Sequence, residues 1–392
     1  MKDYTYIIIG GGMTAGSAVL GIREIDPSGT ILMISEENAL PYNRPPLSKK
    51  LWSGGKEDEI FLAVEERKVD FLLNTIVLSI NPDLKRIAVS SGESFSYDKL
   101  LLATGGYPRG LPFGEGIIHY YRTLEDFHHL KSLTKTMNSF AVIGAGFIGS
   151  ELAAALTLNK KNVTLIENGA GIGWKVFPQD MVRFLNDYYI DKGVMVKAGL
   201  EITSVEKEGN KASINFKHGE ALLVDEVVAG VGIIPNVSLA EDCGLAVKDG
   251  IHVNEILQTS DPSIFSAGDV ANLFNPHLSQ RIRVEHADNA RAMGKAAGRN
   301  MADAIEHYDY LPLFYSDMFD LGYEAVGKID SRLEMVQDWQ EPYRKGVIYY
   351  LEDNQIVGVL LWNVWDKADS AREIIANRKP FKTESLKGLI NY

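Results

Sequence analysis

Two stretches of the chain repeat the same order of apolar, small and polar positions. Residues 6–20 have the sequence YIIIGGGMTAGSAVL and residues 140–156 have the sequence FAVIGAGFIGSELAAAL. Each is an apolar run, then glycines, then apolar residues at helical spacing, which predicts a strand, a glycine-rich turn and a helix. A second apolar run follows in each copy and ends in an acidic residue, Glu36 in the first and Glu167 in the second. The chain therefore contains an internal repeat.

The two copies also close in the same way. Residues 97–108 and residues 224–235 each carry an Asp near the start of an apolar run that ends on Gly and Pro. Between the acid and this closing run, residues 77–92 and 202–219 contain short apolar runs with turn residues, which predict meanders of strands. Strands that alternate with helices place both copies in the α/β class, with parallel sheets covered on both faces.

The glycine turns match the G-x-G-x-x-A/G pattern of Rossmann-like dinucleotide-binding folds. The first glycine allows the tight turn, the second lets the backbone approach a pyrophosphate, and the third small residue packs the helix on the strand. The start of the helix then offers unpaired N–H groups to the phosphates. The positions are Gly10, Gly12 and Ala15 in the first copy and Gly144, Gly146 and Gly149 in the second. One such motif is weak evidence, because glycine turns also serve packing alone, but two copies in the same context predict two dinucleotide sites.

The acids at the second strand ends bear on the choice of cofactor. Glu36 and Glu167 stand where a carboxylate accepts hydrogen bonds from an adenosine ribose, although either is also compatible with a solvated strand end. A carboxylate at Glu167 repels a 2'-phosphate, and no arginine follows it in ENGAGIGWK, so the sequence favours NADH over NADPH. Lys175 is the residue that would favour NADPH instead. Two dinucleotide sites in one chain indicate electron transfer between two dinucleotides, one of them a tightly held flavin.

The domain organisation follows from the repeat. A further strand that ends in Gly-Asp lies within residues 257–273, after the second copy has closed, so we expect the second domain to be inserted within the first. Beyond it the pattern changes to alternating strands and then a helix near residues 367–377, which predicts an α+β domain. The expected domains are residues 1–108 with 237–309 for the first nucleotide-binding domain, residues 109–236 for the second, and residues 310–392 for the C-terminal domain.

Composition narrows the function further. The 392 residues carry 40 Lys and Arg against 52 Asp and Glu, a formal net charge of −12, which disfavours nucleic acid as a partner. The single cysteine, Cys243, excludes an intrachain disulfide, a C-x-x-C pair, a thiolate zinc site and an iron–sulfur cluster, so redox chemistry must come from an organic cofactor. The chain enters its first strand at once and has no apolar run of the roughly 18 residues that a membrane span needs. We expect a cytoplasmic protein that does not cross a bilayer.

Longer motifs carry a resemblance to one family. They are LPYNRPPLSKKLW (40–52), DKLLLATGG (98–106), YRTLEDF (121–127), GIIPNVSLAEDCGL (232–245), LQTSDPSIFSAGDVA (257–271) and VEHADNARAMGKAAG (284–298). With the two glycine motifs they make the chain resemble the FAD-dependent pyridine nucleotide oxidoreductases of the ferredoxin reductase and apoptosis-inducing factor type, and the resemblance covers essentially the whole chain. The C-terminal stretch KGVIYYLEDNQIVGVLLWNVWDKADSAREII looks closer to the apoptosis-inducing factor branch. The resemblance implies that the first domain binds FAD, the second binds NAD(H), and the third is an interface domain.

The family also implies site residues, position by position. In similar proteins the arginine of Y-x-R-P-P-L-S-K contacts the FAD pyrophosphate, which assigns that role to Arg44, and the aspartate of S-A-G-D, here Asp269, binds the ribityl and pyrophosphate region. Each residue also has a purely structural interpretation: Arg44 as a loop arginine beside two prolines, and Asp269 as a helix cap. Tyr315, beside the isoalloxazine in relatives, is equally compatible with core packing. The other positions assigned to FAD are Thr104, Gly105 and Glu285, beside Gly10, Gly12, Ala15 and Glu36, and Gly232 joins those assigned to NAD.

Four residues are expected to act in catalysis. Lys49 corresponds to a lysine that pairs near the flavin N5 with a glutamate, here Glu151, although a glutamate in a first helical turn is also explained by the helix dipole. Phe147 takes the position whose ring screens the flavin until the nicotinamide displaces it. His286, with Glu285, opens a helix whose N-terminus points at the flavin pyrimidine in related folds and stabilises charge on the reduced ring. Phe147 is equally compatible with core packing, and His286 with a buried structural histidine.

Departures from the family pattern limit the chemistry. Disulfide reductases of the wider superfamily keep redox cysteines on the first helix–loop segment, where this chain has PPLSK, so disulfide and peroxidatic mechanisms are excluded and Cys243 is expected to be an ordinary thiol. Residues 338–345 form only a short turn where the eukaryotic factor has a long insertion, and no leader is expected. An apoptotic role therefore does not carry over.

The resemblance implies that hydride passes from NADH to the flavin N5 and that electrons then leave to an acceptor such as a ferredoxin or rubredoxin, a small iron–sulfur carrier. No metal or general base is needed. Such carriers are usually acidic, and a chain at −12 repels them at long range unless a local cluster such as Lys49, Lys50, Arg344 and Lys345 overrides the net field. Two alternatives stay open: an NADH oxidase or quinone reductase, and a redox-sensing protein of the apoptosis-inducing factor kind whose homodimerisation depends on NADH.

Overall fold

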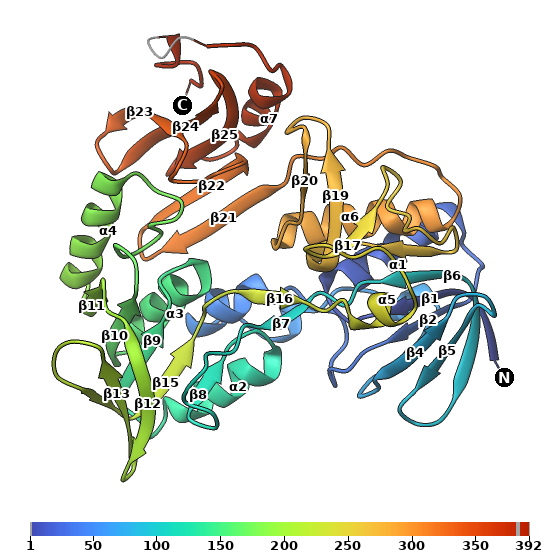
Figure 1. Cartoon of the computed structure of the whole chain (residues 1–392), viewed down its shortest axis with the longest axis horizontal. Helices are drawn as coiled ribbons and strands as arrows, with labels where there is room; N and C mark the ends of the chain where they lie inside the picture. Colours follow the sequence, from blue (N-terminus) through green and yellow to red (C-terminus); the bar gives the residue numbers. More distant parts are fainter. Residues whose placement is uncertain (1, 382–384, 392) are drawn as a thin grey trace. The chain divides into compact units, whose positions relative to one another are not determined.

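The computed structural model describes residues 2–381 and 385–391, and the chain divides into two compact units (Figure 1). Unit 1 consists of Met1–Arg44, Lys56–Tyr107 and Ile234–Leu313, and unit 2 consists of Pro45–Gly55, Pro108–Ile233 and Phe314–Tyr392. Unit 2 thus holds both the second glycine motif and the C-terminal strands. The boundaries of the three expected domains stay a prediction.

Unit 1 is built on a seven-stranded sheet. Across the sheet the strands are β3 (Val69–Leu72), β2 (Ile31–Ile34), β1 (Lys2–Ile9), β6 (Ser94–Leu102), β5 (Arg86–Val89) and β4 (Val77–Asn81), with β18 (Ile264–Ser266) also paired to β6. β1 runs parallel to β2 and β6, and β18 runs parallel to β6. Because β18 follows the whole second copy in the sequence, the expected insertion of the second nucleotide-binding fold within the first is confirmed.

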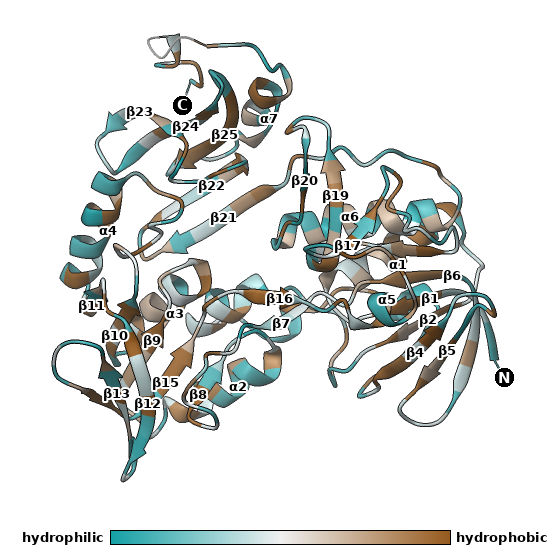
Figure 2. Ribbon diagram, viewed as in Figure 1, coloured by the Kyte–Doolittle hydropathy of each residue, from teal (hydrophilic) through white to brown (hydrophobic). Residues whose placement is uncertain are grey.

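Both faces of this sheet are covered. The helices of unit 1 are α1 (Met13–Ile25), α5 (Ser238–Asp242) and α6 (Ala287–Met301). Ile8 and Leu101 join the hydrophobic cluster that includes α1 and α6, whereas Ile7 and Leu100 join the cluster that includes α5 and the β4–β5 hairpin. Neighbouring residues of a strand point to opposite faces, so the stretches covered on both sides, such as the whole of β2, are continuously apolar. Figure 2 shows brown, apolar stretches in this sheet beside teal, polar ones.

Two smaller sheets accompany it. One consists of β17 (Ile251–Val253), β19 (Ala271–Asn275) and β20 (Gln280–Ile282), and the other pairs β7 (Gly106–Pro108) with β16 (Ile233–Pro235). The pair Gly105 and Gly106 leads into β7, and the SAGD segment, residues 266–269, connects β18 to β19.

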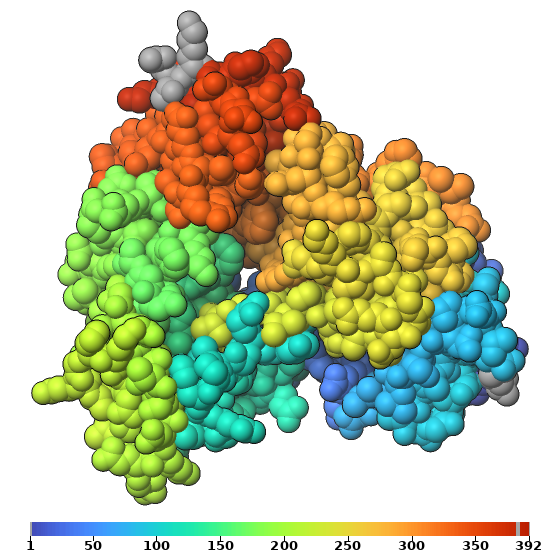
Figure 3. Space-filling model, in the orientation of Figure 1, coloured from blue at the N-terminus to red at the C-terminus, as the bar shows by residue number. Residues whose placement is uncertain are grey.

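Unit 2 contains a second parallel sheet on the same plan. Its strands, in order, are β11 (Val194–Ala198), β10 (Asn162–Glu167), β9 (Ser139–Ile143), β15 (Glu226–Ala229) and β8 (Ile118–Tyr120). Its helices are α2 (Leu124–Leu133), α3 (Phe147–Leu158) and α4 (Gln179–Asp191). The predicted meander is the antiparallel sheet of β12 (Ile202–Glu208), β13 (Lys211–Phe216) and β14 (Leu222–Val224). Its hairpin projects at the lower left of the space-filling view (Figure 3).

The C-terminal part of unit 2 is an antiparallel sheet with one helix, as the α+β prediction requires. Its strands, in order, are β21 (Leu313–Met318), β22 (Leu321–Gly327), β25 (Gln355–Trp362), β24 (Lys345–Glu352) and β23 (Glu334–Glu341), and α7 (Ala368–Ala376) packs on β22 and β25. Trp362, Tyr349 and Leu360 are fully buried in it. The sequence pattern misses β21, because its residues LFYSDM do not alternate between apolar and polar.

The longest α-helix of the described residues is α6, with 15 residues. Within that part of the chain, every helix is too short or too polar to cross a membrane.

Candidate dinucleotide and redox site

The glycine loop of unit 1 has the geometry of an anion cradle. β1 ends at Ile9, and α1 begins at Met13 with Gly12 as its N-cap, a residue that has no side chain to cap the helix. Gly10 adopts φ +122°, and a Cβ built there would collide with the backbone oxygen of Ala103, so the turn requires glycine. The first N–H groups of α1 stay available to a bound phosphate. Ala15 is fully buried under this turn, as expected for the third small position.

The glycine loop of unit 2 repeats this arrangement. Gly146 is the N-cap of α3, and a Cβ built on it meets open space, which suits the close approach of a ligand. Gly144 adopts φ +95°, and a Cβ there would lie 2.6 Å from the oxygen of Gly230. A Cβ on Gly149 would collide with the oxygen of Gly144, so helix and strand touch through their backbones. Both loops fit a dinucleotide pyrophosphate.

Strand register distinguishes the two expected ribose acids. Glu167 is the last residue of β10, and its Oε2 accepts from the backbone N–H of Ala145 at 2.8 Å, inside the glycine loop. In the first copy the corresponding register position is Ser35, because Ile9 pairs with Ile34 as Ile143 pairs with Ile166. Glu36 lies one residue farther on and is exposed.

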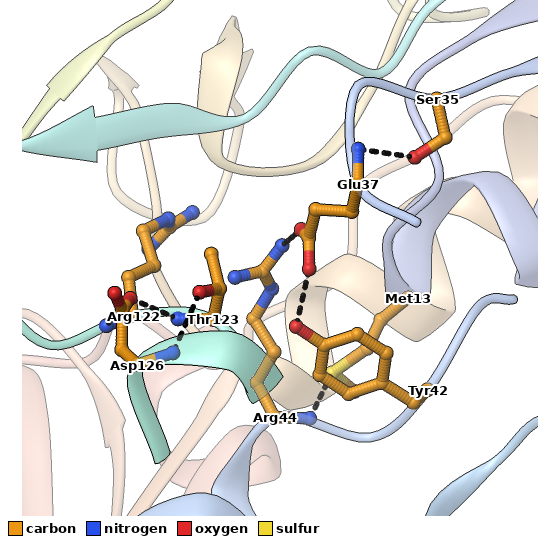
Figure 4. A network of polar contacts seen from close by, with 8 residues as sticks. All are labelled: Met13, Ser35, Glu37, Tyr42, Arg44, Arg122, Thr123 and Asp126. Carbon is orange, nitrogen blue, oxygen red and sulfur yellow. Dashed lines mark hydrogen bonds and ion pairs between the residues drawn. The ribbon is translucent and has the colours of Figure 1, made fainter. Parts of the chain in front are cut away.

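Arg44 takes part in a compact polar network of unit 1 (Figure 4). Its Nη2 pairs with Oε1 of Glu37 at 2.5 Å, and the Tyr42 hydroxyl donates to the other oxygen of that carboxylate at 2.6 Å. Burial opposes the charged guanidinium, but the negative groups around it, Glu37 and Asp269 among them, raise the pKa of Arg44. A Cβ built at Gly12 would lie 3.9 Å from Nη2, so Arg44 stands beside the first glycine loop. That position suits a contact with a pyrophosphate.

Arg283, a residue that the sequence reasoning missed, holds two of the expected FAD positions. Its Nη1 donates to the backbone oxygen of Asp269 at 3.1 Å and to Oε1 of Glu285 at 2.6 Å, and its Nε donates to Asp249 at 2.9 Å. Burial disfavours its charge, yet Glu285 and Asp249 raise the pKa of Arg283. The sequence offers one indication of a role for Arg283, because this residue directly precedes the VEHADNARAMG motif.

The remaining expected positions fall at turns and at one helix start. His286 is the N-cap of α6, and its Nδ1 accepts from the backbone N–H of Asp288 at 3.4 Å, so it has a structural role as a cap. Thr104 donates to the backbone oxygen of Asn236 at 2.7 Å. Gly105 and Gly232 adopt φ +61° and φ +98°, the left-handed region that glycine enters without strain.

Lys49 and Glu151 do form the expected pair, and both belong to unit 2. Lys49 Nζ lies 3.1 Å from Oε1 of Glu151 and 3.1 Å from Oδ2 of Asp317, while the Glu151 side chain is 5% exposed. Two serines complete the shell: Ser48 donates to Oε2 of Glu151 at 2.5 Å, and Ser316 donates to Oε1 at 2.6 Å. The sequence reasoning missed Ser48, Ser316 and Asp317.

Opposing effects act on this pair. Burial raises the pKa of Glu151, and the charge of Lys49 and the two serine hydroxyls counteract it only in part. Burial disfavours the ammonium of Lys49, but Glu151 and Asp317 outweigh it and raise the pKa of Lys49. The ammonium also lies 4.7 Å from the ring centroid of Tyr315, a cation–π distance. Lys49 thus contacts both Glu151 and Tyr315, so three of the expected residues are brought together.

Phe147 is the first residue of α3 and is half-buried. Its ring centroid lies 6.2 Å from that of Tyr323, which stacks on Trp362 at 5.9 Å. Its expected role as a movable screen stays a prediction. Burial raises the pKa of the Cys243 thiol, the single cysteine, which suits an unreactive side chain.

Comparison with known proteins identifies the family. Residues 4–294 match the model described as pyridine nucleotide-disulphide oxidoreductase, and residues 334–377 match that of apoptosis-inducing factor, mitochondrion-associated, C-term. Mitochondrial apoptosis-inducing factor 1 of Dictyostelium discoideum is 36% identical over 97% of this chain and 79% of its own length. Peroxisomal monodehydroascorbate reductase 4 of Arabidopsis thaliana is 34% identical over 92% of this chain and 79% of its own length. The covalent putidaredoxin reductase–putidaredoxin complex matches with a TM-score of 0.91 at 28% identity, covering 98% of this chain and 96% of that chain.

These matches confirm the resemblance drawn from the sequence motifs, including that of the C-terminal stretch to apoptosis-inducing factor. They also agree with the two glycine loops and the parallel sheets that carry them. This protein belongs to the pyridine nucleotide-disulphide oxidoreductase family and is an FAD-dependent NAD(P)H oxidoreductase whose single cysteine leaves it without a redox-active disulfide.

Proposed function

We propose that this protein is an NADH oxidoreductase that passes hydride from NADH to the flavin N5 and then electrons to a small iron–sulfur carrier in the cytoplasm. The observation that supports this most is the pair of glycine loops, each at the start of a helix whose N-cap is glycine. Two dinucleotide loops in one chain allow electrons to pass from one dinucleotide to the other. Because the chain has a single cysteine, this transfer does not use an intrachain disulfide. FAD, when bound, accepts a hydride and releases electrons one at a time.

The chain's own residues bind and orient the two cofactors. Backbone N–H groups at the starts of α1 and α3 bind the two pyrophosphates, and Arg44 adds a fixed positive charge at the first. Lys49 provides a positive charge for the flavin ring, as the family resemblance assigns. Glu151 and its serine partners hold the ammonium in one place, because the carboxylate is buried and hydrogen-bonded on both oxygens.

The preference for NADH rests on Glu167. Its carboxylate is held inside the second glycine loop, where the ribose of an adenine dinucleotide binds in this fold. A 2'-phosphate at that place would meet a negative charge at short range.

A protein carrier is supported by the structural neighbour in which a reductase is joined to putidaredoxin. Most of the net charge of −12 belongs to residues of unit 1, so unit 2 is close to neutral and repels an acidic carrier less. Lys49 adds little to any surface cluster, because it is 16% exposed and pairs with two carboxylates. Arg344 lies 3.7 Å from Asp320, so its charge is also partly matched.

A panel of acceptors tests this proposal. Purified FAD-loaded protein is supplied with NADH and, in separate assays, with ferredoxin, rubredoxin, a quinone, monodehydroascorbate and oxygen. We expect fast, saturable reduction of cytochrome c only when an iron–sulfur carrier is present. Turnover that is fastest with oxygen or quinone, or with monodehydroascorbate, contradicts the carrier and identifies the acceptor instead.

The relation to apoptosis-inducing factor favours one second candidate, a redox sensor whose dimerisation depends on NADH. Its support is the 36% identity to the Dictyostelium protein and the match of residues 334–377. Size-exclusion chromatography with and without NADH under anaerobic conditions separates it from the reductase. A shift to dimer on NADH addition, with slow reoxidation by every acceptor, favours the sensor.

A further inference from the structure

The Glu167 carboxylate is held by three protein donors. Its Oε2 accepts from the N–H of Ala145 at 2.8 Å, and its Oε1 accepts from the N–H of Gly169 at 3.0 Å. The third donor is the indole Nε1 of Trp174, which reaches Oε1 at 3.2 Å. An ionised carboxylate offers about four acceptor positions. The capacity that remains lies on Oε2, so a ribose hydroxyl has one oxygen to bind.

Trp174 is itself fixed in place. A Cβ built at Gly169 would collide with its indole ring, so the ring lies directly on the glycine backbone. The neighbouring Gly173 donates its N–H to the oxygen of Ala145 at 2.9 Å, which ties this segment to the second glycine loop. The Trp174 side chain is half-buried. Its N–H therefore approaches Glu167 from a position that the local backbone determines.

The same indole also bears on Lys175, the residue that would favour NADPH. Lys175 Nζ lies 5.4 Å from the ring centroid of Trp174, a cation–π distance. A lysine free to turn toward Glu167 would offset the negative charge that repels a 2'-phosphate. Trp174 donates to the Glu167 carboxylate and attracts the Lys175 ammonium to its ring face. It therefore affects both groups that decide between NADH and NADPH.

We propose that Trp174 is a positioning residue that fixes the Glu167 carboxylate and thereby sets the preference for NAD(H) over NADP(H). The inference rests on the proposed function, which assigns the second glycine loop to NADH. The physical reason is orientation: losing the indole N–H leaves Oε1 with one donor fewer and lets the carboxylate turn away from the ribose. In metal sites, removal of a residue that orients a ligating group typically costs about 10–100-fold in affinity, and the same reasoning applies to an acid that binds a ribose.

The test compares three substitutions in the FAD-loaded protein, with binding of NAD⁺ and NADP⁺ measured by calorimetry. Trp174→Phe keeps a ring on Gly169 but removes the N–H. Trp174→His keeps a five-membered ring with an N–H and serves as the conservative rescue. Trp339→Phe is the matched control, because the Trp339 indole also donates to a side-chain oxygen, Oε1 of Gln337 at 2.9 Å, in the same unit.

We expect Trp174→Phe to weaken NAD⁺ binding about tenfold, the factor typical of losing one hydrogen bond to a charged group. NADP⁺ binding should be unchanged or tighter, so the ratio of the two dissociation constants falls about tenfold. Trp174→His should keep that ratio within about threefold of wild type, and Trp339→Phe should leave it unchanged. A general loss of structure would weaken both ligands equally, whereas the ratio moves only if Glu167 or Lys175, the two groups that distinguish the ligands, is displaced.

A Trp174→Phe ratio within twofold of wild type overturns the inference, and so does an equal change in Trp339→Phe. If Trp174→Phe does not fold, a Trp174→His variant that loses the preference overturns it, and one that keeps the preference supports it. Wild-type protein that prefers NADP⁺ refutes the NADH assignment and the inference with it. Wild-type protein that prefers NAD⁺ while Trp174→Phe keeps that preference refutes the role of Trp174 alone.

Discussion

Replacement of Lys49 by methionine tests the buried ion pair most sharply. Methionine has a similar length and no charge, so Glu151 would be left in the interior with only its serine donors. Removing one partner of a buried pair typically costs about 3–5 kcal/mol of the free energy of unfolding. We expect a value near the lower limit, about 3 kcal/mol at pH 8, because Ser48 and Ser316 still donate to the carboxylate.

The loss should depend on pH, and its sign follows from the pKa of Glu151. Burial already raises this pKa, and Lys49 counteracts the shift. Without Lys49 the folded-state pKa rises further above that of the unfolded chain. A carboxyl with a raised folded pKa contributes its full stability below the unfolded pKa and loses it as pH rises through the folded pKa. Stability of the variant should therefore fall as pH rises above the ordinary glutamate range, by at most about 1.4 kcal/mol per pH unit.

Urea unfolding of the FAD-loaded protein at pH 5.5 and at pH 8, followed by tryptophan fluorescence, measures this. The matched control is Lys50→Met, which removes an exposed lysine one residue away. A second control, the double variant Lys49→Met with Glu151→Gln, should remove most of the pH dependence because no carboxyl is left to titrate. The reasoning is refuted if Lys49→Met loses the same free energy at both pH values, or if Lys50→Met loses as much.

Three further outcomes follow from the site. Gly149→Ala places a Cβ against the oxygen of Gly144, so NAD⁺ affinity measured by calorimetry should fall at least about tenfold while FAD content is unchanged. Arg44→Met removes the positive partner of Glu37 beside the first loop and leaves that carboxylate only the Tyr42 hydroxyl, so FAD should dissociate at least about tenfold more readily on dilution, as followed by flavin fluorescence. Arg283→Met should lower the melting temperature by about 2–4 °C and weaken FAD retention, as scanning fluorimetry with and without added FAD would show; no change in either contradicts its bridging role.

The repeat, the fold class and the glycine loops could be predicted from the sequence because their chemistry leaves few alternatives. Gly10 and Gly144 take positive φ angles where another backbone segment comes close, so only glycine fits. Each is followed by the same spacing of small residues, which makes the motif visible in the sequence. Glu167 follows the same logic, since it ends an apolar strand. In the first copy, the acid that ends the second apolar run pointed to Glu36, whereas strand pairing places Ser35 at the position equivalent to Glu167. Register is decided by pairing between strands, which the spacing of acids alone does not determine.

The partners of Glu151 could not be predicted for a different reason. Ser48 and Ser316 lie 103 and 165 residues from it in the sequence, and a hydroxyl carries no local signal of what it will contact. Trp174 could not be predicted for the same reason, because an indole N–H also carries no local signal of its partner. Only the structure shows that its N–H points at the acid that the sequence had already singled out.

The most direct test of the account is an anaerobic titration of the purified protein with NADH, followed at the flavin absorption band. We expect a yellow protein whose flavin is bleached stoichiometrically by NADH, faster than by NADPH, and restored by an oxidised iron–sulfur carrier. A protein that takes up no FAD on reconstitution, or whose flavin band is unchanged by excess NADH, contradicts it.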